Sequence, residues 1–127
     1  MAKSINKKIL IADDDPTMLE VLVDSFAMEG FSILSAVNGK EAIDIALREH
    51  PDIILLDVMM PKMSGLEVLE KLRQDEWGKS ADVIFLSNLS DMEKVAKAAQ
   101  GGAFSYLIKS DKTTKEIIQV VKDKLGI

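Results

Sequence analysis

Polar side chains of a few chemically useful types follow four apolar runs of the sequence. Two carboxylates, Asp13 and Asp14, come directly after one run, and a third, Asp57, follows another. The hydroxyl of Ser87 and the ammonium of Lys109 follow two further runs. Clustered carboxylates repel one another unless a cation is present, and hard divalent ions prefer oxygen ligands. If these residues converge, they predict a site for a divalent cation and an anionic group.

The chemistry predicted for such a site is the binding or transfer of a phosphoryl group. Mg²⁺ keeps several waters and binds a few carboxylates plus a phosphate, so it fits this set better than an all-protein calcium cage does. Lys109 would act as a point charge on the phosphoryl group, and Ser87 would donate a hydrogen bond. Asp57 could be the nucleophile, because carboxylates can form aspartyl phosphates. Alone, each residue would more simply be a turn, cap or surface residue, so it is the combination that favours a site.

The apolar runs predict five strands of a parallel sheet. Residues 9–12, 53–56 and 83–86 are continuously apolar, which is typical of central strands buried on both faces. Residues 31–36 and 104–108 include serines, as expected of edge strands. The carboxyl ends of parallel strands form the usual ligand-binding edge of such a sheet, and the five polar residues follow those ends.

Helical periodicity follows each run. The expected starts are Pro16 after an Asp15 cap, the turn at Asn38 and Gly39, the Ser64 cap, Ser90 or Asp91, and Thr113 or Thr114; the first helix ends by Gly30 and the fourth at Gly101 and Gly102. The expected buried positions are Leu19, Leu22, Val23 and Phe26; Ile43, Ala46 and Leu47; Leu66, Leu69 and Leu72; Met92, Val95, Ala96 and Ala99; and Ile117, Val121 and Leu125. A polar loop is expected over residues 75–82.

Alternating strands and helices predict an α/β fold with a doubly wound, five-stranded parallel sheet in the order 2-1-3-4-5, a flavodoxin-like (βα)5 arrangement. We expect one domain over residues 1–127 with a core over 8–125. In this order the strands that precede Asp13 and Asp57 are neighbours, at about 4.8 Å. The strand that precedes Lys109 is two spacings from Asp57, roughly 10 Å, which a long side chain can span.

Composition excludes several other classes of protein. The chain has 127 residues, no cysteine and a net charge of -5, so we expect no disulfide framework, no thiolate metal site and no direct binding to nucleic acid. No apolar run reaches the length of a membrane span, and residues 1–8 do not resemble a signal peptide. We therefore expect a cytoplasmic monomer without a membrane partner.

Four motifs give the sequence a specific resemblance to receiver domains of two-component response regulators, especially stand-alone, CheY-like receivers. The motifs are ILIADDDP at 9–16, ILLDVMMP at 54–61 with Gly65, LS at 86–87 and YLIK at 106–109. The resemblance implies that Asp57 accepts a phosphoryl group from a histidine kinase or phosphotransfer protein. It also implies that Asp13, Asp14 and the Met59 backbone carbonyl hold Mg²⁺ together with Asp57.

The resemblance further implies a conformational switch and a set of residues that control how long the phosphoryl group lasts. Ser87 and Tyr106 would move together on phosphorylation and change a surface of the fourth helix, fifth strand and fifth helix that binds a downstream protein target. Met59 and Leu89, two residues beyond the phosphoacceptor and the hydroxyl, would tune how long the phosphoryl group lasts; neither is polar, so we expect slow loss. Such a domain is a phosphoacceptor regulator rather than an enzyme, catalysing only its own phosphorylation and dephosphorylation.

Two positions depart from the family pattern, and two other functions stay open. Ser110 stands where the family usually has proline, so a cis peptide after Lys109 would cost about 2.5 to 4 kcal/mol rather than about 1. Asn88 replaces a small residue and would narrow access to the site. A flavodoxin-like module that binds a nucleotide or FMN shares this strand order, although its first loop would have to hold phosphate without acidic side chains. A receiver-like module that is never phosphorylated is the other alternative.

Overall fold

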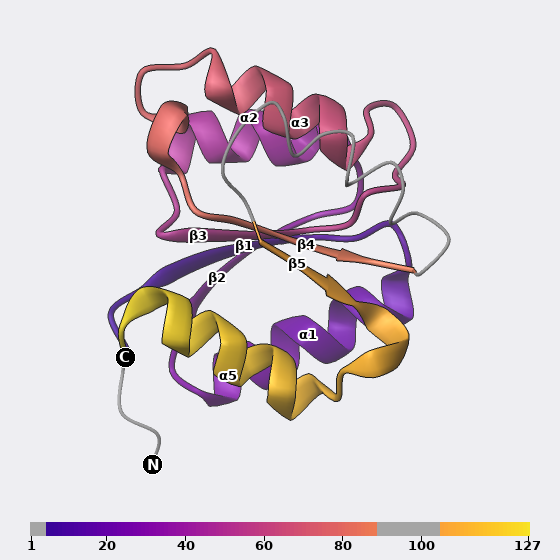
Figure 1. Ribbon diagram of the computed structural model, residues 1–127, viewed down its shortest axis with the longest axis vertical. Coiled ribbons are helices and arrows are strands. Elements are labelled where there is room, and N and C mark those ends of the chain that lie inside the picture. Colours follow the sequence, from indigo (N-terminus) through magenta and orange to yellow (C-terminus); the bar gives the residue numbers. More distant parts are fainter. Residues whose placement is uncertain (1–4, 89–104) are drawn as a thin grey trace.

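A computed structural model describes residues 5–88 and 105–127 of the chain (Figure 1). Its strands form one parallel sheet in the order β2-β1-β3-β4-β5, as predicted. The strands are β1 (Lys8–Ala12), β2 (Ser32–Ala36), β3 (Ile53–Leu56), β4 (Val83–Ser87) and β5 (Ser105–Ile108). The helices are α1 (Pro16–Met28), α2 (Gly39–Glu49), α3 (Gly65–Arg73) and α5 (Thr114–Leu125), with short 3-10 turns at Gly78–Ser80 and Lys109–Asp111. The expected fourth helix lies outside the described residues.

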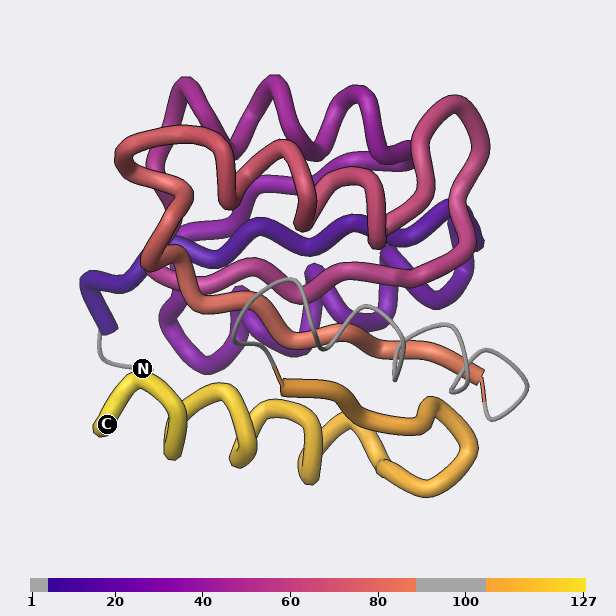
Figure 2. Tube along the Cα trace, turned by 45° about the horizontal axis from the view of Figure 1, so that its top comes forward, coloured from indigo at the N-terminus to yellow at the C-terminus, as the bar shows by residue number. Residues whose placement is uncertain are grey.

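Helices cover both faces of the sheet. Figure 1 shows α2 and α3 above the sheet and α1 and α5 below it. Figure 2 shows from another angle that α2 and α3 lie side by side along the upper face. The predicted doubly wound α/β architecture is therefore confirmed. Within the described ranges, 5–88 and 105–127, none of the helices combines the length and the hydrophobicity that a membrane span requires.

The core has two layers because successive side chains of a strand point to opposite faces. In β1, Leu10 packs with α2 and α3, whereas Ile9 and Ile11 pack with α1 and α5. The three central strands are buried along almost their whole length, while β2 and β5 are only partly buried, as the sequence indicated. Each fully buried large aliphatic side chain contributes about 1.5 to 3 kcal/mol of hydrophobic stabilisation.

Among the described residues, one expected core position was wrong and three others are buried only in part. Leu47 is 39% exposed, because the buried stripe of α2 runs through Ala42, Ile43 and Ala46, and Leu47 lies at its margin. On α3, Val68 is fully buried and Leu66 only partly so. The remaining partly buried members of the expected set are Val23 and Leu125. Leu66, Val23 and Leu125 still pack against the core, so the two layers are unchanged.

Polar residues start the helices largely as expected. The Asp15 carboxylate accepts hydrogen bonds from the backbone N–H groups of Thr17 and Met18, and Ser64 accepts one from Glu67. Thr113, rather than Thr114, caps α5 in a reciprocal capping box with Glu116. None of the described peptide bonds is cis. The caps fix where each helix begins relative to the strand before it.

We predict that Gly65→Ala destabilises the fold near Asp57. A Cβ at this first residue of α3 would lie 2.2 Å from the Asp57 carbonyl oxygen and 3.1 Å from Cε1 of Phe85. The backbone must shift to relieve this overlap, at a cost of about 1 to 3 kcal/mol in the free energy of unfolding. Urea denaturation measures the loss, with Glu70→Ala on the exposed side of α3 as control. Equal stability of the two variants would contradict this close packing.

Candidate functional site

The carboxyl ends of β1 and β3 set the floor of the candidate site. Asp13 directly follows β1 and Asp57 directly follows β3, and these strands are hydrogen-bonded neighbours. The Asp57 N–H donates to the Ala12 carbonyl at 3.0 Å, and the Asp13 N–H donates to the Ala36 carbonyl at 3.1 Å. Sheet pairing therefore continues up to the two carboxylates and holds their backbones in place.

Three carboxylates converge at this edge. One oxygen from each of Asp13, Asp14 and Asp57 lies within 4.8 Å of the others, which is the convergence that the strand order predicted. Asp13 and Asp57 are buried, whereas Asp14 is exposed. A hard divalent cation such as Mg²⁺ prefers this type of donor, with waters completing its shell. The oxygen set therefore fits Mg²⁺.

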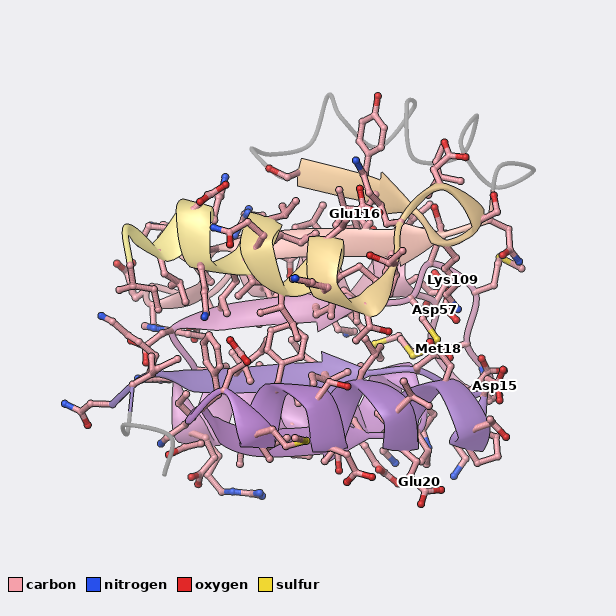
Figure 3. The ribbon with its side chains drawn as sticks, turned by 90° about the horizontal axis from the view of Figure 1, so that it is seen from below. Asp15, Met18, Glu20, Asp57, Lys109 and Glu116 are labelled. Carbon is pink, nitrogen blue, oxygen red and sulfur yellow. The ribbon has the colours of Figure 1, made fainter. Side chains whose placement is uncertain are left out.

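Lys109 bridges the two buried carboxylates. Its ammonium nitrogen lies 3.0 Å from Oδ2 of Asp13 and 3.2 Å from Oδ2 of Asp57. The side chain spans from the end of β5 across β4 to β3, as the two-strand separation requires. Figure 3 shows Lys109 and Asp57 close together at one end of the molecule. Lys109 thus supplies one positive charge that offsets part of the negative charge of the carboxylates.

Backbone N–H groups hold the other oxygen of each buried carboxylate. Oδ1 of Asp13 accepts from the Asp15 N–H at 3.0 Å, and Oδ1 of Asp57 accepts from the Met59 N–H at 3.2 Å. Each carboxylate is therefore fixed by a loop amide on one oxygen and by Lys109 on the other. This leaves little rotational freedom for either side chain.

Burial is the largest influence on the pKa of Asp57 and of Lys109. Burial, together with the nearby charge of Asp13, raises the pKa of Asp57 to about 6, although Lys109 and the Met59 N–H act in the opposite direction. Burial tends to lower the pKa of Lys109, but Asp57 and Asp13 more than offset it, so this pKa lies above its usual value. At neutral pH, Asp57 is therefore mainly a carboxylate and Lys109 is charged.

A hollow of about 450 Å³ opens above Asp57; we call it the acidic hollow. It is lined by Asp14, Asp15, Met18, Asp57, Met59, Asn88 and Lys109. Met18, for which the sequence predicted no role, lies in the first turn of α1 and lines this hollow. Asp15 is the expected cap and also lines the hollow, and the exposed Asn88 lies at its wall.

The other expected site residues lie outside the carboxylate cluster. Ser87 is completely buried at the end of β4, and its hydroxyl has no hydrogen-bond partner within the described part of the chain. Tyr106 lies on the edge strand β5 and is 49% exposed. Leu89 is outside the described residues. Met59 is 46% exposed and lines the acidic hollow.

Comparisons with known proteins agree on one family. The model of the family described as "Response regulator receiver domain" matches residues 9–122. The polar-differentiation response regulator DivK of Brucella ovis is 30% identical over 122 residues, which are 96% of this chain and 98% of DivK. A chain in the CheX-CheY-BeF3-Mg+2 complex from Borrelia burgdorferi has a TM-score of 0.81 and 30% identity, over 94% of this chain and 89% of that chain.

Some similar proteins are much longer than the matched region. The probable transcriptional regulator ycf27 of Porphyridium aerugineum is 35% identical over 103 residues, which are 81% of this chain but 42% of that protein. The chain thus spans less than half of this relative. The similarity to it covers those 103 residues alone.

We predict that ionised Asp57 destabilises the cation-free fold. The pKa of Asp57 rises from 3.8 to about 6 on folding, so between these pH values the folded state binds more protons than the unfolded state. The Asp57 contribution to stability therefore falls as pH rises through this window. As pH rises from 4 to 6.5, the free energy of unfolding of Asp57→Asn should rise by about 1 to 2 kcal/mol relative to that of the parent. Urea denaturation in the presence of chelator measures both. Asp24→Asn, an exposed change on α1, is the control and should show no such rise in relative stability. If the difference between Asp57→Asn and the parent does not change with pH, the claim that burial of ionised Asp57 destabilises the fold is wrong.

Proposed function

Because this chain belongs to the response regulator receiver domain family, we propose that Asp57 accepts a phosphoryl group and that phosphorylation alters a protein-binding surface. The observation that carries this proposal is the Lys109 ammonium, 3.2 Å from the Asp57 carboxylate within a cluster of three carboxylates. A nucleophile, a charge clamp and oxygen ligands for a cation are thus in one site. Receiver domains are regulators that interact with histidine kinases and downstream targets, and they bind Mg²⁺ in their acidic site.

Asp57 would act as the nucleophile. One carboxylate oxygen attacks the phosphorus of the donor, the bond from phosphorus to the donor's leaving group breaks, and that group departs with the electron pair. Lys109 neutralises negative charge on the transferred oxygens, and the Met59 N–H keeps the carboxylate oriented. The backbone contacts of Asp57 mean that little reorganisation precedes attack.

A divalent cation would complete the site. Asp13, Asp14 and Asp57 would hold Mg²⁺, with the Met59 carbonyl as a further ligand. When bound, Mg²⁺ supplies positive charge that stabilises the phosphoryl oxygens. The Borrelia burgdorferi complex that resembles this chain is described as containing BeF3 and Mg+2. This similarity supports the proposal of a magnesium-dependent reaction.

Ser87 and Tyr106 would convert phosphorylation into a surface change. The buried Ser87 hydroxyl has an unused donor within the described part of the chain, and a phosphoryl group on Asp57 would offer it an acceptor. A move of Ser87 toward that group would leave room for the half-exposed Tyr106 ring to turn inward. The altered surface would include β5 and α5 and the expected fourth helix, and would bind a downstream protein. The donor would be a histidine kinase or phosphotransfer protein.

Two other functions are less well supported. A nucleotide- or FMN-binding flavodoxin-like module needs phosphate-binding amides and hydroxyls at the first loop, but Asp13 and Asp14 place negative charge there. A receiver that is never phosphorylated would be expected to lack part of the reactive set. Here Asp13, Asp14 and Asp57 converge, and Lys109 contacts Asp13 and Asp57.

We predict that a small acyl phosphate and Mg²⁺ add one phosphoryl group to the protein. Intact-mass analysis should show one addition in the parent and in Asp24→Asn, and none in Asp57→Asn, because only the last removes the nucleophile. Chelator should suppress labelling, since the carboxylates then lack their cation. Equal labelling of Asp57→Asn, or labelling indifferent to chelator, would refute the assignment.

We also predict a long-lived phosphoryl group. Met59 and Leu89 would flank the approach of water, and neither side chain accepts a strong hydrogen bond from it. The double variant Met59→Asn with Leu89→Glu should lose the phosphoryl group about tenfold faster or more, because polar side chains orient the attacking water. Mass analysis after donor removal measures the decay, with Met28→Asn, an exposed change on α1, as control. Parent decay as fast as that of the double variant, at saturating Mg²⁺, would contradict this account.

A further inference from the structure

Two methionines line the acidic hollow beside Asp57. Met18 comes from the first turn of α1, and Met59 comes from the loop after β3. Figure 3 shows Met18 near Asp57 and Asp15 at the same end of the molecule. Met59 is 46% exposed, whereas Met60 and Met63 in the same loop are partly buried against the core. A thioether is therefore accessible to small solutes at the phosphoacceptor.

We propose that Met59 is a site of reversible oxidation and that its sulfoxide shortens the lifetime of the phosphoryl group on Asp57. This inference rests on the proposed function, since it concerns how fast the aspartyl phosphate is lost. The relevant oxidants are small peroxides that can enter the acidic hollow. The modification would make the duration of the signal depend on the redox conditions around the protein.

The chemistry of the modification is a two-electron oxidation of sulfur. The Met59 sulfur attacks one oxygen of hydrogen peroxide, an S–O bond forms, the O–O bond breaks, and the peroxide is reduced to water after proton transfer. The product is methionine sulfoxide, which methionine sulfoxide reductases convert back to the thioether. No group other than the peroxide is needed for the forward step.

The effect on lifetime follows from the change in polarity. A thioether is a weak hydrogen-bond acceptor, whereas a sulfoxide oxygen is a strong one on a polar, chiral side chain. The Met59 N–H already binds Oδ1 of Asp57 at 3.2 Å, so the new acceptor would be attached to a backbone that contacts the phosphorylated carboxylate. A sulfoxide oxygen at the wall of the acidic hollow would accept a hydrogen bond from an incoming water and orient that water for attack.

Met28 provides a matched control for oxidation itself. It is 76% exposed, and it lies at the far end of α1, against a separate hollow lined by α5 residues. An oxidant therefore reaches Met28 at least as readily as Met59, but its sulfoxide would be remote from Asp57. Met28→Leu and Met59→Leu thus separate an effect at the acidic hollow from general oxidation.

The test exposes the protein to hydrogen peroxide, maps each methionine by peptide mass analysis, and then follows phosphoryl loss after removal of acetyl phosphate. We expect Met59 and Met28 to oxidise before Met60 and Met63, and the decay to become on the order of tenfold faster. Phosphoryl loss from Met59→Leu should occur at the same rate with and without oxidant, whereas Met28→Leu should respond to oxidant like the parent. Met59→Gln should decay fast without oxidant, and reductase treatment should restore slow decay in the parent.

Two results would overturn the inference. One is oxidation of Met59 no faster than that of Met60 and Met63, and the other is unchanged decay once Met59 is a sulfoxide. The samples that receive no oxidant distinguish failure of the oxidation inference from failure of the proposed function. Absence of label on Asp57 in those samples would refute phosphorylation, and with it the effect on lifetime, before any methionine is oxidised.

Discussion

The interaction on which this structure depends is the bridge from Lys109 to two buried carboxylates. Asp13 and Asp57 are like charges held at the ends of adjacent strands, and Lys109 lies about 3 Å from an oxygen of each. Loss of the Lys109 ammonium would leave both buried carboxylates uncompensated, and leaving a buried charge unpaired typically costs about 3 to 5 kcal/mol. The bridge also connects the end of β5 with the ends of β1 and β3, although neither of these strands is hydrogen-bonded to β5 in the sheet. One ammonium group therefore offsets part of the negative charge of the site and links the end of β5 to the ends of β1 and β3.

The backbone near Asp57 is constrained just as closely. Gly65 packs its Cα against the Asp57 carbonyl, and its N–H donates to the Val58 carbonyl at 2.8 Å. At the other end of the same loop, Gly39 of α2 packs against the Met63 carbonyl, leaving no room for a Cβ. The first residues of α3 and α2 thus pack against the two ends of the loop that carries Met59. Because the loop is held at both ends, a change at Asp57 has few ways to be absorbed locally.

The sequence predicted the fold and the convergence of charges because both follow from strand order. Three apolar runs and two mixed ones specify which strands are central, and the polar residues that end them must then meet at one edge. It could not predict that Lys109 contacts Asp13 as well as Asp57, since the rotamer of a long side chain depends on its surroundings. Leu47 was placed wrongly because a helical stripe has margins that only packing against a neighbour decides. Met18 was missed because a thioether at helical spacing resembles an ordinary core residue.

Without a cation, several energetically unfavourable interactions occur together at one edge of the sheet. Asp57 is ionised at neutral pH despite a pKa raised to about 6 by burial, and like charges of Asp13 and Asp14 lie nearby. A buried hydroxyl without a partner, such as that of Ser87 within the described residues, costs about 1 to 3 kcal/mol. A cation would relieve the repulsion, and a phosphoryl group would accept from Ser87. Each term that weakens the free state is thus one that the proposed ligands would remove, so their binding energy would be available to shift the structure rather than only to fill the site.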